Sequence, residues 1–220
     1  MLCIKTGMSS EYQVAKQYAA PGTLILTGLQ TVGTLQTVVP TNCEAIISFG
    51  LCGGLSPQAQ IGQAFICDTL VTPKGDFQAD VAWRKRLFAA TKYYERHWWS
   101  SDAFNTANTV AEREQLLAQT GCWIIDDETY AVAQFAQARG IPFQALRTVS
   151  DGAEDNLPQA VIDALNPDGS DDLEAVLLSV IKDPIQIPDL LKTAEEYYKS
   201  LAELNTAAIA IGPQFQWGTL

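Results

Sequence analysis

Histidine and basic residues are scarce in this chain, and each shortage excludes particular classes of partner or active site. Lysine and arginine together number 14, against 25 aspartates and glutamates, and the formal net charge is -11 at pH 7. An acidic surface repels nucleic-acid phosphates and anionic lipid headgroups, so we expect neither as a partner. The single histidine, His97, offers no metal-ligand cluster, and no serine lies in a G-x-S-x-G motif. We therefore expect no bound metal and no serine-type hydrolase.

Paired cysteines and long apolar runs are missing as well. The five cysteines include no C-x-x-C pair, and several lie inside apolar runs such as "AFICDTL". Such a pattern indicates buried, reduced thiols in a reducing compartment. No apolar window reaches the roughly 18 residues of a membrane span, and the N-terminus lacks the charged start of a signal peptide. A cytoplasmic protein without a membrane span is expected.

The chain length and composition predict one α/β domain. With 220 residues, of which 47% are hydrophobic, the chain can bury a substantial core. Continuous apolar runs that end in glycine or a turn are typical of strands covered by helices on both faces. We expect a three-layer α/β/α fold with a central mixed sheet, a core over about 1–160 and a helical C-terminal segment over about 161–210. The runs that predict strands are 1–7, 23–28, 45–54, 63–73, 122–126 and 141–151.

Helical periodicity fills the intervals between these runs and dominates the C-terminal segment. Residues 11–20, 80–94, 109–121 and 129–140 fit helices, the last two closed by glycine. In residues 189–204 apolar side chains recur on one face, which we interpret as a helix packed on the body of the protein. The residues of this predicted stripe are Leu190, Leu191, Ala194, Tyr197, Tyr198, Leu201 and Leu204.

Four segments place glycines or carboxylates at strand ends, where open α/β sheets build their sites. In "TGMSSE", Gly7 can expose backbone N–H groups and Glu11 falls in the first turn of a helix. Glycines in "SFGLCGGLSP" allow a ligand to approach the backbone closely, but they lack dinucleotide or NTP-binding spacing. An ordinary strand-to-helix turn and tight sheet packing explain these two segments equally well.

The other two segments carry carboxylates. Asp126, Asp127 and Glu128 lie where a strand passes into a helix, so they could cap that helix or accept hydrogen bonds from a sugar diol. Asp151 follows the strand "LRTVS" and precedes a glycine. It could form an Asx-turn or serve as a catalytic acid.

Taken in order, these segments resemble the nucleoside phosphorylase and nucleosidase superfamily, of the purine and uridine phosphorylase type. The segments that carry the resemblance are "TGMSSE", "ISFGLCGGLSPQAQIGQAFICDTLV", "SSDAF", "IIDDETYAVA" and "LRTVSD". The tail that begins "LNPDGSDDLEAVLLSVIKDP" is similar to the helices of the hopanoid-associated phosphorylases, a smaller branch. The resemblance implies a homo-oligomer, dimeric or larger, that acts on a small-molecule nucleoside and needs no cofactor.

The resemblance also implies roles for individual residues. Asp151 would hydrogen-bond or protonate the purine N7 as the base leaves, and Glu128 would hold the 2′- and 3′-hydroxyls of the ribose. Phe104 would stack on the base, over a pocket floor formed by Gly50 and Gly53. The full set of implied substrate-binding residues is Gly7, Ser48, Gly50, Gly53, Phe104, Asp127, Glu128 and Ser150.

The nucleophile is where this sequence departs from the family pattern. Relatives that use phosphate hold it with arginines and a serine, whereas the matching positions here are Glu11, Ser48 and Leu51. Glu11 would repel a phosphate dianion, and in hydrolytic relatives the equivalent glutamate orients the attacking water. The tail favours phosphorolysis with inorganic phosphate as co-substrate, and the local chemistry favours water. Asp127, which stands where a methionine is usual, leaves a third alternative, a catalytically impaired nucleoside-binding relative.

Overall fold

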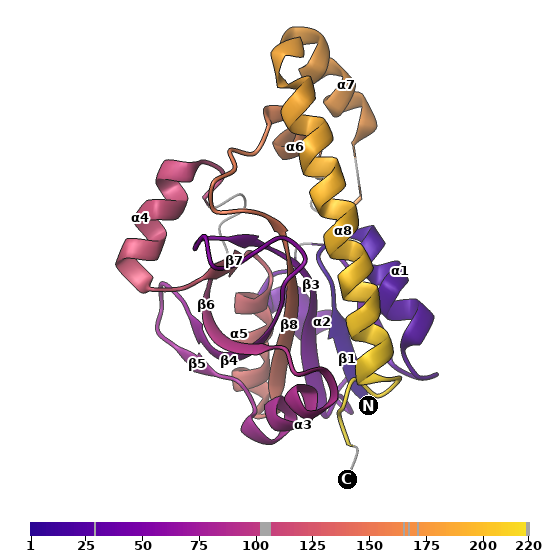
Figure 1. The fold of residues 1–220 in the computed structure, drawn as a ribbon. Helices are drawn as coiled ribbons and strands as arrows, with labels where there is room; N and C mark the ends of the chain where they lie inside the picture. The colour runs from indigo at the N-terminus through magenta and orange to yellow at the C-terminus, as the bar shows by residue number, and fades with distance from the viewer. Residues whose placement is uncertain (29, 102–106, 165, 167, 171, 219–220) are drawn as a thin grey trace.

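A mixed sheet forms the centre of the molecule in our computed structural model, which describes residues 1–28, 30–101, 107–164, 166, 168–170 and 172–218 (Figure 1). Its strands follow the order β2-β1-β3-β7-β6-β4-β5, and β8 pairs with both β3 and β4. The strands are β1 (Leu2–Lys5), β2 (Leu24–Leu26), β3 (Ala45–Gly54), β4 (Ala64–Val71), β5 (Phe77–Gln78), β6 (Tyr94–Ser100), β7 (Ile124–Asp126) and β8 (Phe143–Asp151).

The pairing of β8 closes part of this sheet on itself. Strand β3 pairs with β7, β7 with β6, β6 with β4, β4 with β8, and β8 again with β3. The β3–β7, β4–β8 and β4–β5 pairs are antiparallel, while the remaining pairs are parallel. The predicted mixed sheet is confirmed, and its closure draws the ends of β3, β7 and β8 together.

Helices cover both faces of the sheet and complete the predicted three layers. One apolar core lies between the sheet and α2 and α5, and a second lies between the sheet and α1, α3 and α8. The helices are α1 (Ser9–Tyr18), α2 (Val32–Val38), α3 (Val81–Thr91), α4 (Val110–Thr120), α5 (Thr129–Arg139), α6 (Gln159–Asp163), α7 (Leu173–Lys182) and α8 (Ile187–Ile211), with a 3₁₀ turn at Pro184–Gln186. All five cysteines are free and buried, as the sequence predicts.

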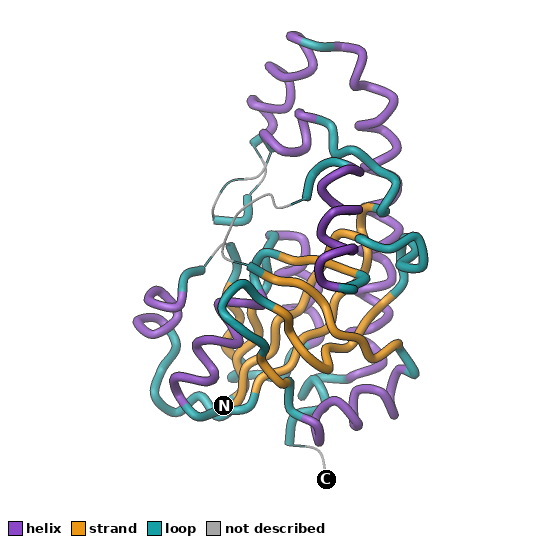
Figure 2. Tube along the Cα trace, turned by 90° about the vertical axis from the view of Figure 1, so that its left-hand side faces the viewer, coloured by secondary structure: helices purple, strands orange, loops and turns teal. Residues whose placement is uncertain are grey.

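The C-terminal segment is helical, but only half of its long helix packs on the body. Helix α8 crosses the sheet with its C-terminal half, while its N-terminal half extends beyond the sheet together with α6 and α7 (Figures 1 and 2). The predicted apolar stripe is therefore wrong at Leu191 and Tyr198, which are 66% and 68% exposed, and right at Leu204, which is buried. None of the helices within the described residues is long and apolar enough to cross a membrane.

Candidate active site

Glu11 is anchored by backbone N–H groups from two different segments. The N–H groups of Gly7 and Met8 donate to Oε2 at 2.7 and 3.0 Å, and the N–H of Leu51 donates to Oε1 at 2.6 Å. The side chain is nearly inaccessible to solvent. Because these N–H bonds come from two segments, they orient the Glu11 carboxylate between the turn that follows β1 and strand β3.

Gly50 and Gly7 lack side chains at the places where the carboxylates of Glu11 and Glu128 lie. A Cβ atom on Gly50 would lie 2.5 Å from all three atoms of the Glu11 carboxylate. A Cβ atom on Gly7 would lie 2.2 Å from Oε1 of Glu128. Neither glycine has a positive φ, so both are needed for their lack of a side chain. Both glycines, for which the sequence predicts substrate contact, thus leave room for the carboxylates.

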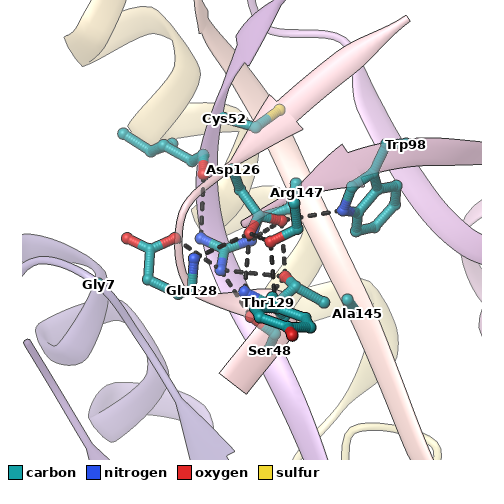
Figure 3. A network of polar contacts seen from close by, with 12 residues as sticks. Gly7, Ser48, Cys52, Trp98, Asp126, Glu128, Thr129, Ala145 and Arg147 are labelled. Carbon is teal, nitrogen blue, oxygen red and sulfur yellow. Dashed lines mark hydrogen bonds and ion pairs between the residues drawn. The ribbon is translucent and has the colours of Figure 1, made fainter. Parts of the chain in front are cut away.

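Arg147 connects the carboxylates of Glu128 and Asp126 (Figure 3). Its Nη2 lies 3.0 Å from Oε2 of Glu128, and its Nε lies 3.5 Å from Oδ2 of Asp126. Nη2 also donates to Oγ of Ser48 at 2.6 Å, and Nη1 donates to the carbonyl oxygen of Leu51 at 3.0 Å. Burial alone would lower the pKa of Arg147, but the two carboxylates outweigh it and raise that pKa.

Asp126 fixes the turn from β7 into α5. Its carboxylate accepts hydrogen bonds from the Trp98 indole at 2.9 Å and the Ser100 hydroxyl at 2.8 Å. It also accepts the backbone N–H groups of Glu128 and Thr129 at 3.0 and 2.7 Å. These bonds cap the helix and set the direction in which Glu128 leaves it. Asp126 is thus the cap that the sequence offered as one reading of this segment.

Glu128 has an environment unlike that of a surface carboxylate. Burial raises the pKa of Glu128, Arg147 opposes this rise, and the carboxylates of Asp126 and Glu11 add to it. A carboxylate with one guanidinium partner and nearby like charges keeps lone pairs for hydroxyl donors. The site thereby combines the Glu11 carboxylate, which backbone N–H groups hold in place, with Glu128, whose pKa is raised.

A buried lysine, Lys5, lies beside this network at the end of β1. Its Nζ donates to the carbonyl oxygen of Thr6 at 2.6 Å, and the residue is fully buried. Burial lowers the pKa of Lys5 to about 8, although the charge of Glu128 acts in the opposite direction. The cluster therefore contains a cation that can lose its charge close to neutral pH.

Asp151 lies at the end of β8, paired in register with Gly53 of β3. The Ser150 hydroxyl donates to Oδ1 at 2.8 Å, and Nη2 of Arg113 lies 2.5 Å from Oδ2. The side chain of Asp151 is 15% exposed, so it can meet a ligand. A Cβ atom on the adjacent Gly53 would lie 3.0 Å from Oδ2 of Asp151. A side chain at this position would therefore crowd the carboxylate.

These groups surround one cavity of about 160 Å³. Six predicted site residues line it, namely Glu11, Gly53, Asp127, Glu128, Ser150 and Asp151. Gly7, Ser48 and Gly50 do not line it, and the Oγ of Ser48, which is fully buried, accepts a hydrogen bond from Arg147. Phe104 lies outside the described residues.

A second, more apolar hollow of about 410 Å³ opens beside the first. The two hollows share Met8, Leu51, Ser150, Asp151 and Leu157. The second continues between α6 and α8, where its lining includes Val161, Leu190, Ala194, Tyr197 and Leu201. A ligand bound at the carboxylates could therefore extend an apolar substituent toward these helices.

Sequence reasoning missed the two arginines, Arg113 and Arg147. Arg147 is a charged residue within the apolar strand "FQALRTV", and a charge in a strand buried on both faces is a signal that could have found it. Arg113 is on a helix whose pattern gives no such signal. Within the described residues, no group of histidine, cysteine, aspartate and glutamate side chains is arranged to hold a metal ion.

The three-layer fold with a carboxylate-lined cavity at the strand ends defines a class of α/β proteins that includes known nucleosidases. The futalosine hydrolase of Helicobacter pylori superposes with a TM-score of 0.62 at 13% identity, covering 94% of this chain and 96% of that one. A 5′-methylthioadenosine nucleosidase of Arabidopsis thaliana superposes with a TM-score of 0.60 at 18% identity, covering 100% and 96%. At these identities the likeness concerns the fold.

A third similar structure is the 5′-methylthioadenosine/S-adenosylhomocysteine nucleosidase of Helicobacter pylori, with a TM-score of 0.62 at 12% identity, covering 94% of this chain and 97% of that one. No curated protein sequence matches the chain significantly. The model of the phosphorylase superfamily matches residues 12–182. The chain therefore belongs to the phosphorylase superfamily. Its closer resemblance to the hopanoid-associated branch stays a prediction.

Proposed function

We propose that this protein hydrolyses the N-ribosidic bond of a purine nucleoside or a 5′-substituted adenosine. The observation that carries the proposal is the position of Glu11, whose carboxylate accepts the N–H groups of Gly7, Met8 and Leu51. Two of those N–H groups lie in the turn between β1 and α1, and such a turn before a helix is where a phosphate would otherwise bind. The carboxylate occupies them, so the site offers a base for water where a phosphorylase needs an anion site.

The charges around the cavity support water over phosphate. Five carboxylates line it, and Arg113 is the one basic side chain among the described lining residues. Arg113 is already paired with Asp151, and Arg147 is paired with Glu128 and Asp126 below the cavity. Two like charges 4 Å apart repel each other by about 4 kcal/mol at an effective dielectric constant of about 20. Hydrolysis therefore fits the charges around the cavity better than phosphorolysis, which the tail of the sequence favours.

Three of these carboxylates then have roles in the reaction. Glu128, fixed by Arg147, holds the ribose hydroxyls and stabilises the positive charge that develops on the sugar. Glu11 accepts a proton from water as the water oxygen bonds to C1′. The C1′–N9 bond breaks, its electron pair moves into the purine, and Asp151 gives a proton to N7. General acid catalysis of this kind contributes roughly 10²–10⁴-fold.

The neighbouring apolar hollow supports a substrate with a 5′ substituent. It meets the catalytic cavity at Met8, Leu51 and Asp151 and is lined largely by apolar side chains of α6 and α8. Burial of an apolar group stabilises a complex by about 25 cal/mol per Å². We therefore expect 5′-methylthioadenosine to have a higher kcat/KM than adenosine.

The test is release of free base from adenosine, inosine and 5′-methylthioadenosine, each with and without inorganic phosphate. The proposal expects release at the same rate in both conditions. Release that requires phosphate would make the protein a phosphorylase. Failure of all three substrates, with no thermal shift from the free purines, would refute the proposal for ordinary nucleosides, whereas a thermal shift without any release would favour the nucleoside-binding alternative.

A further inference from the structure

Lys5 is a charged residue in strand β1, whose other residues are apolar, and its side chain is fully buried. Burial of an ammonium group destabilises the folded state unless its surroundings compensate. Lys5 pairs in register with Ser48 of the parallel strand β3, so both side chains point to the same face of the sheet. That face is covered by α5, whose Thr129 donates to Oγ of Ser48. An apolar side chain would fill this place at lower cost, so the charge needs another explanation.

The ammonium group of Lys5 and the carboxylate of Glu11 bind opposite ends of one peptide group. Nζ of Lys5 donates to the carbonyl oxygen of Thr6 at 2.6 Å. The N–H of the same peptide group, which belongs to Gly7, donates to Oε2 of Glu11 at 2.7 Å. A peptide group is conjugated, so a cation at its oxygen draws electrons from its nitrogen and makes the N–H a stronger donor. The Thr6–Gly7 peptide therefore connects the charge of Lys5 to the position of Glu11.

This peptide group is held in place by β2 and the residues that follow it. The N–H of Thr6 donates to the carbonyl oxygen of Leu26 at 2.8 Å, and the N–H of Gly28 donates to the carbonyl oxygen of Gly7 at 2.9 Å. The peptide groups on both sides are thus fixed, which restricts rotation of the one between them. Nζ of Lys5 and Oε2 of Glu11 therefore stay at its two ends.

We propose that Lys5 is a positioning residue that acts on Glu11 through the Thr6–Gly7 peptide. This inference rests on the proposed function, in which Glu11 accepts a proton from the attacking water. A stronger bond from the N–H of Gly7 to Oε2 holds the carboxylate more firmly in the geometry that proton transfer requires. Lys5 does not line the cavity, so it should affect the rate of the reaction and not the binding of the substrate.

The charge of Lys5 changes within an accessible pH range, because burial lowers its pKa to about 8. The other ionisable groups that act on Lys5 come from its own strand and four further segments, namely Cys3 of β1, Glu11 of α1, Asp126 of β7, Glu128 before α5 and Arg147 of β8. The three carboxylates favour the charged lysine, whereas the guanidinium opposes it. Above the pKa, the neutral amine polarises the peptide group less. The contribution of Lys5 to the rate should therefore decline as the pH rises through about 8.

The experiment compares adenine release from 5′-methylthioadenosine by the wild type and Lys5→Met between about pH 6 and pH 10. At pH 7 we expect kcat of the variant to be about 10-fold lower, because a charged partner roughly doubles the strength of a hydrogen bond. KM should stay within about threefold. The ratio of the two kcat values should decrease above about pH 8, and titrations that both proteins share cancel in this ratio. Lys5→Arg, which keeps the charge, should recover part of the rate.

A second comparison removes the residue through which Lys5 acts. In a Glu11→Gln background, Lys5→Met should lower kcat by less than about twofold, because the two substitutions affect the same step. The matched control is Lys85→Met, which removes one positive charge from an exposed position on α3. It should leave kcat and its pH dependence unchanged. Should Lys5→Met fail to fold, Lys5→Gln, which keeps a hydrogen-bond donor without the charge, carries both comparisons.

The outcomes separate this inference from the proposed function. Equal kcat values in the wild type and Lys5→Met, or a kcat ratio that does not change with pH, would overturn the inference and leave the proposed function intact. An undiminished loss in the Glu11→Gln background would do the same. Full activity in Glu11→Gln alone, or a wild type inert toward the substrate, would overturn the two together.

Discussion

Replacement of Gly50 by alanine tests whether Glu11 is held where the structure places it. The added Cβ would lie 2.5 Å from the carboxylate carbon and both oxygens of Glu11. The carboxylate cannot move aside freely, because three backbone N–H groups fix it. A hydrogen bond to a charged group contributes about 1.5–3 kcal/mol, and overpacking costs about 1–3 kcal/mol. We expect a loss of about 3 kcal/mol in the free energy of unfolding.

The same substitution should also lower the catalytic rate. A shift of about 1 Å in a catalytic group can cost about 100-fold in rate, so kcat for base release should fall by about that factor. Urea unfolding measures the stability, and release of free base measures the rate. Gly33→Ala is the control, because the nearest atom to a Cβ on Gly33 of α2 is 3.7 Å away. That change should leave activity unaltered and stabilise the protein by about 0.5–1 kcal/mol.

The double variant Glu11→Ala, Gly50→Ala identifies the source of the effect. If Gly50→Ala acts by displacing the Glu11 carboxylate, removing that carboxylate should relieve the clash. The stability losses of the two single variants should then fail to add by 1 kcal/mol or more, a coupling on the order found for residues in contact. Full activity and stability in Gly50→Ala, or additive losses in the double variant, would refute this description of the site.

Three further substitutions test the remaining charges. Arg147→Met leaves the buried carboxylates of Asp126 and Glu128 without their cation, and urea unfolding should show a loss of about 3–5 kcal/mol; a loss below 1 kcal/mol would contradict the pairing. Asp151→Asn should lower kcat for base release by about 10²–10⁴-fold. It should also lower the free energy of unfolding by about 2 kcal/mol, because it weakens the bond to Arg113. Full activity in this variant would remove Asp151 from the mechanism. Lys5→Met should raise stability at pH 7 by on the order of 3 kcal/mol, because the pKa of Lys5 falls from 10.5 unfolded to about 8 folded. Between pH 8 and pH 10.5 the unfolded state binds more protons than the folded state, so the stability of the wild type should rise with pH. The stability advantage of Lys5→Met should therefore shrink over this range. A stability advantage that is independent of pH would contradict the burial of a charged lysine.

Much of the site could be predicted because its residues lie at strand ends. Glu11, Glu128 and Asp151 each follow a glycine-punctuated or apolar run, and a sheet brings the ends of its strands to one edge. The structure places all three carboxylates on one cavity. Their roles in the reaction are still proposals, since position alone does not assign chemistry. A helix cap was one of the two alternatives for residues 126–128, and the backbone N–H groups that Asp126 accepts fit that alternative.

The parts that the sequence did not predict depend on long-range pairing. The closure of β8 onto both β3 and β4 cannot be read from the periodicity of any one strand, because it is a property of pairs. Arg113 belongs to a helix whose pattern indicates only a solvated surface, and its burial depends on the carbonyls of Gly54 and Gly152. Likewise, Leu191 fits an apolar stripe, yet it is exposed because α8 extends past the sheet.

Product analysis in the presence of millimolar inorganic phosphate distinguishes hydrolysis of the N-ribosidic bond from phosphorolysis. Wild-type protein is incubated with 5′-methylthioadenosine and phosphate, and the sugar product is identified by mass spectrometry. Because Glu11 occupies the N–H groups that would bind phosphate, we expect a free reducing sugar, 5-methylthioribose, together with adenine. A 1-phosphorylated sugar as the product would contradict it.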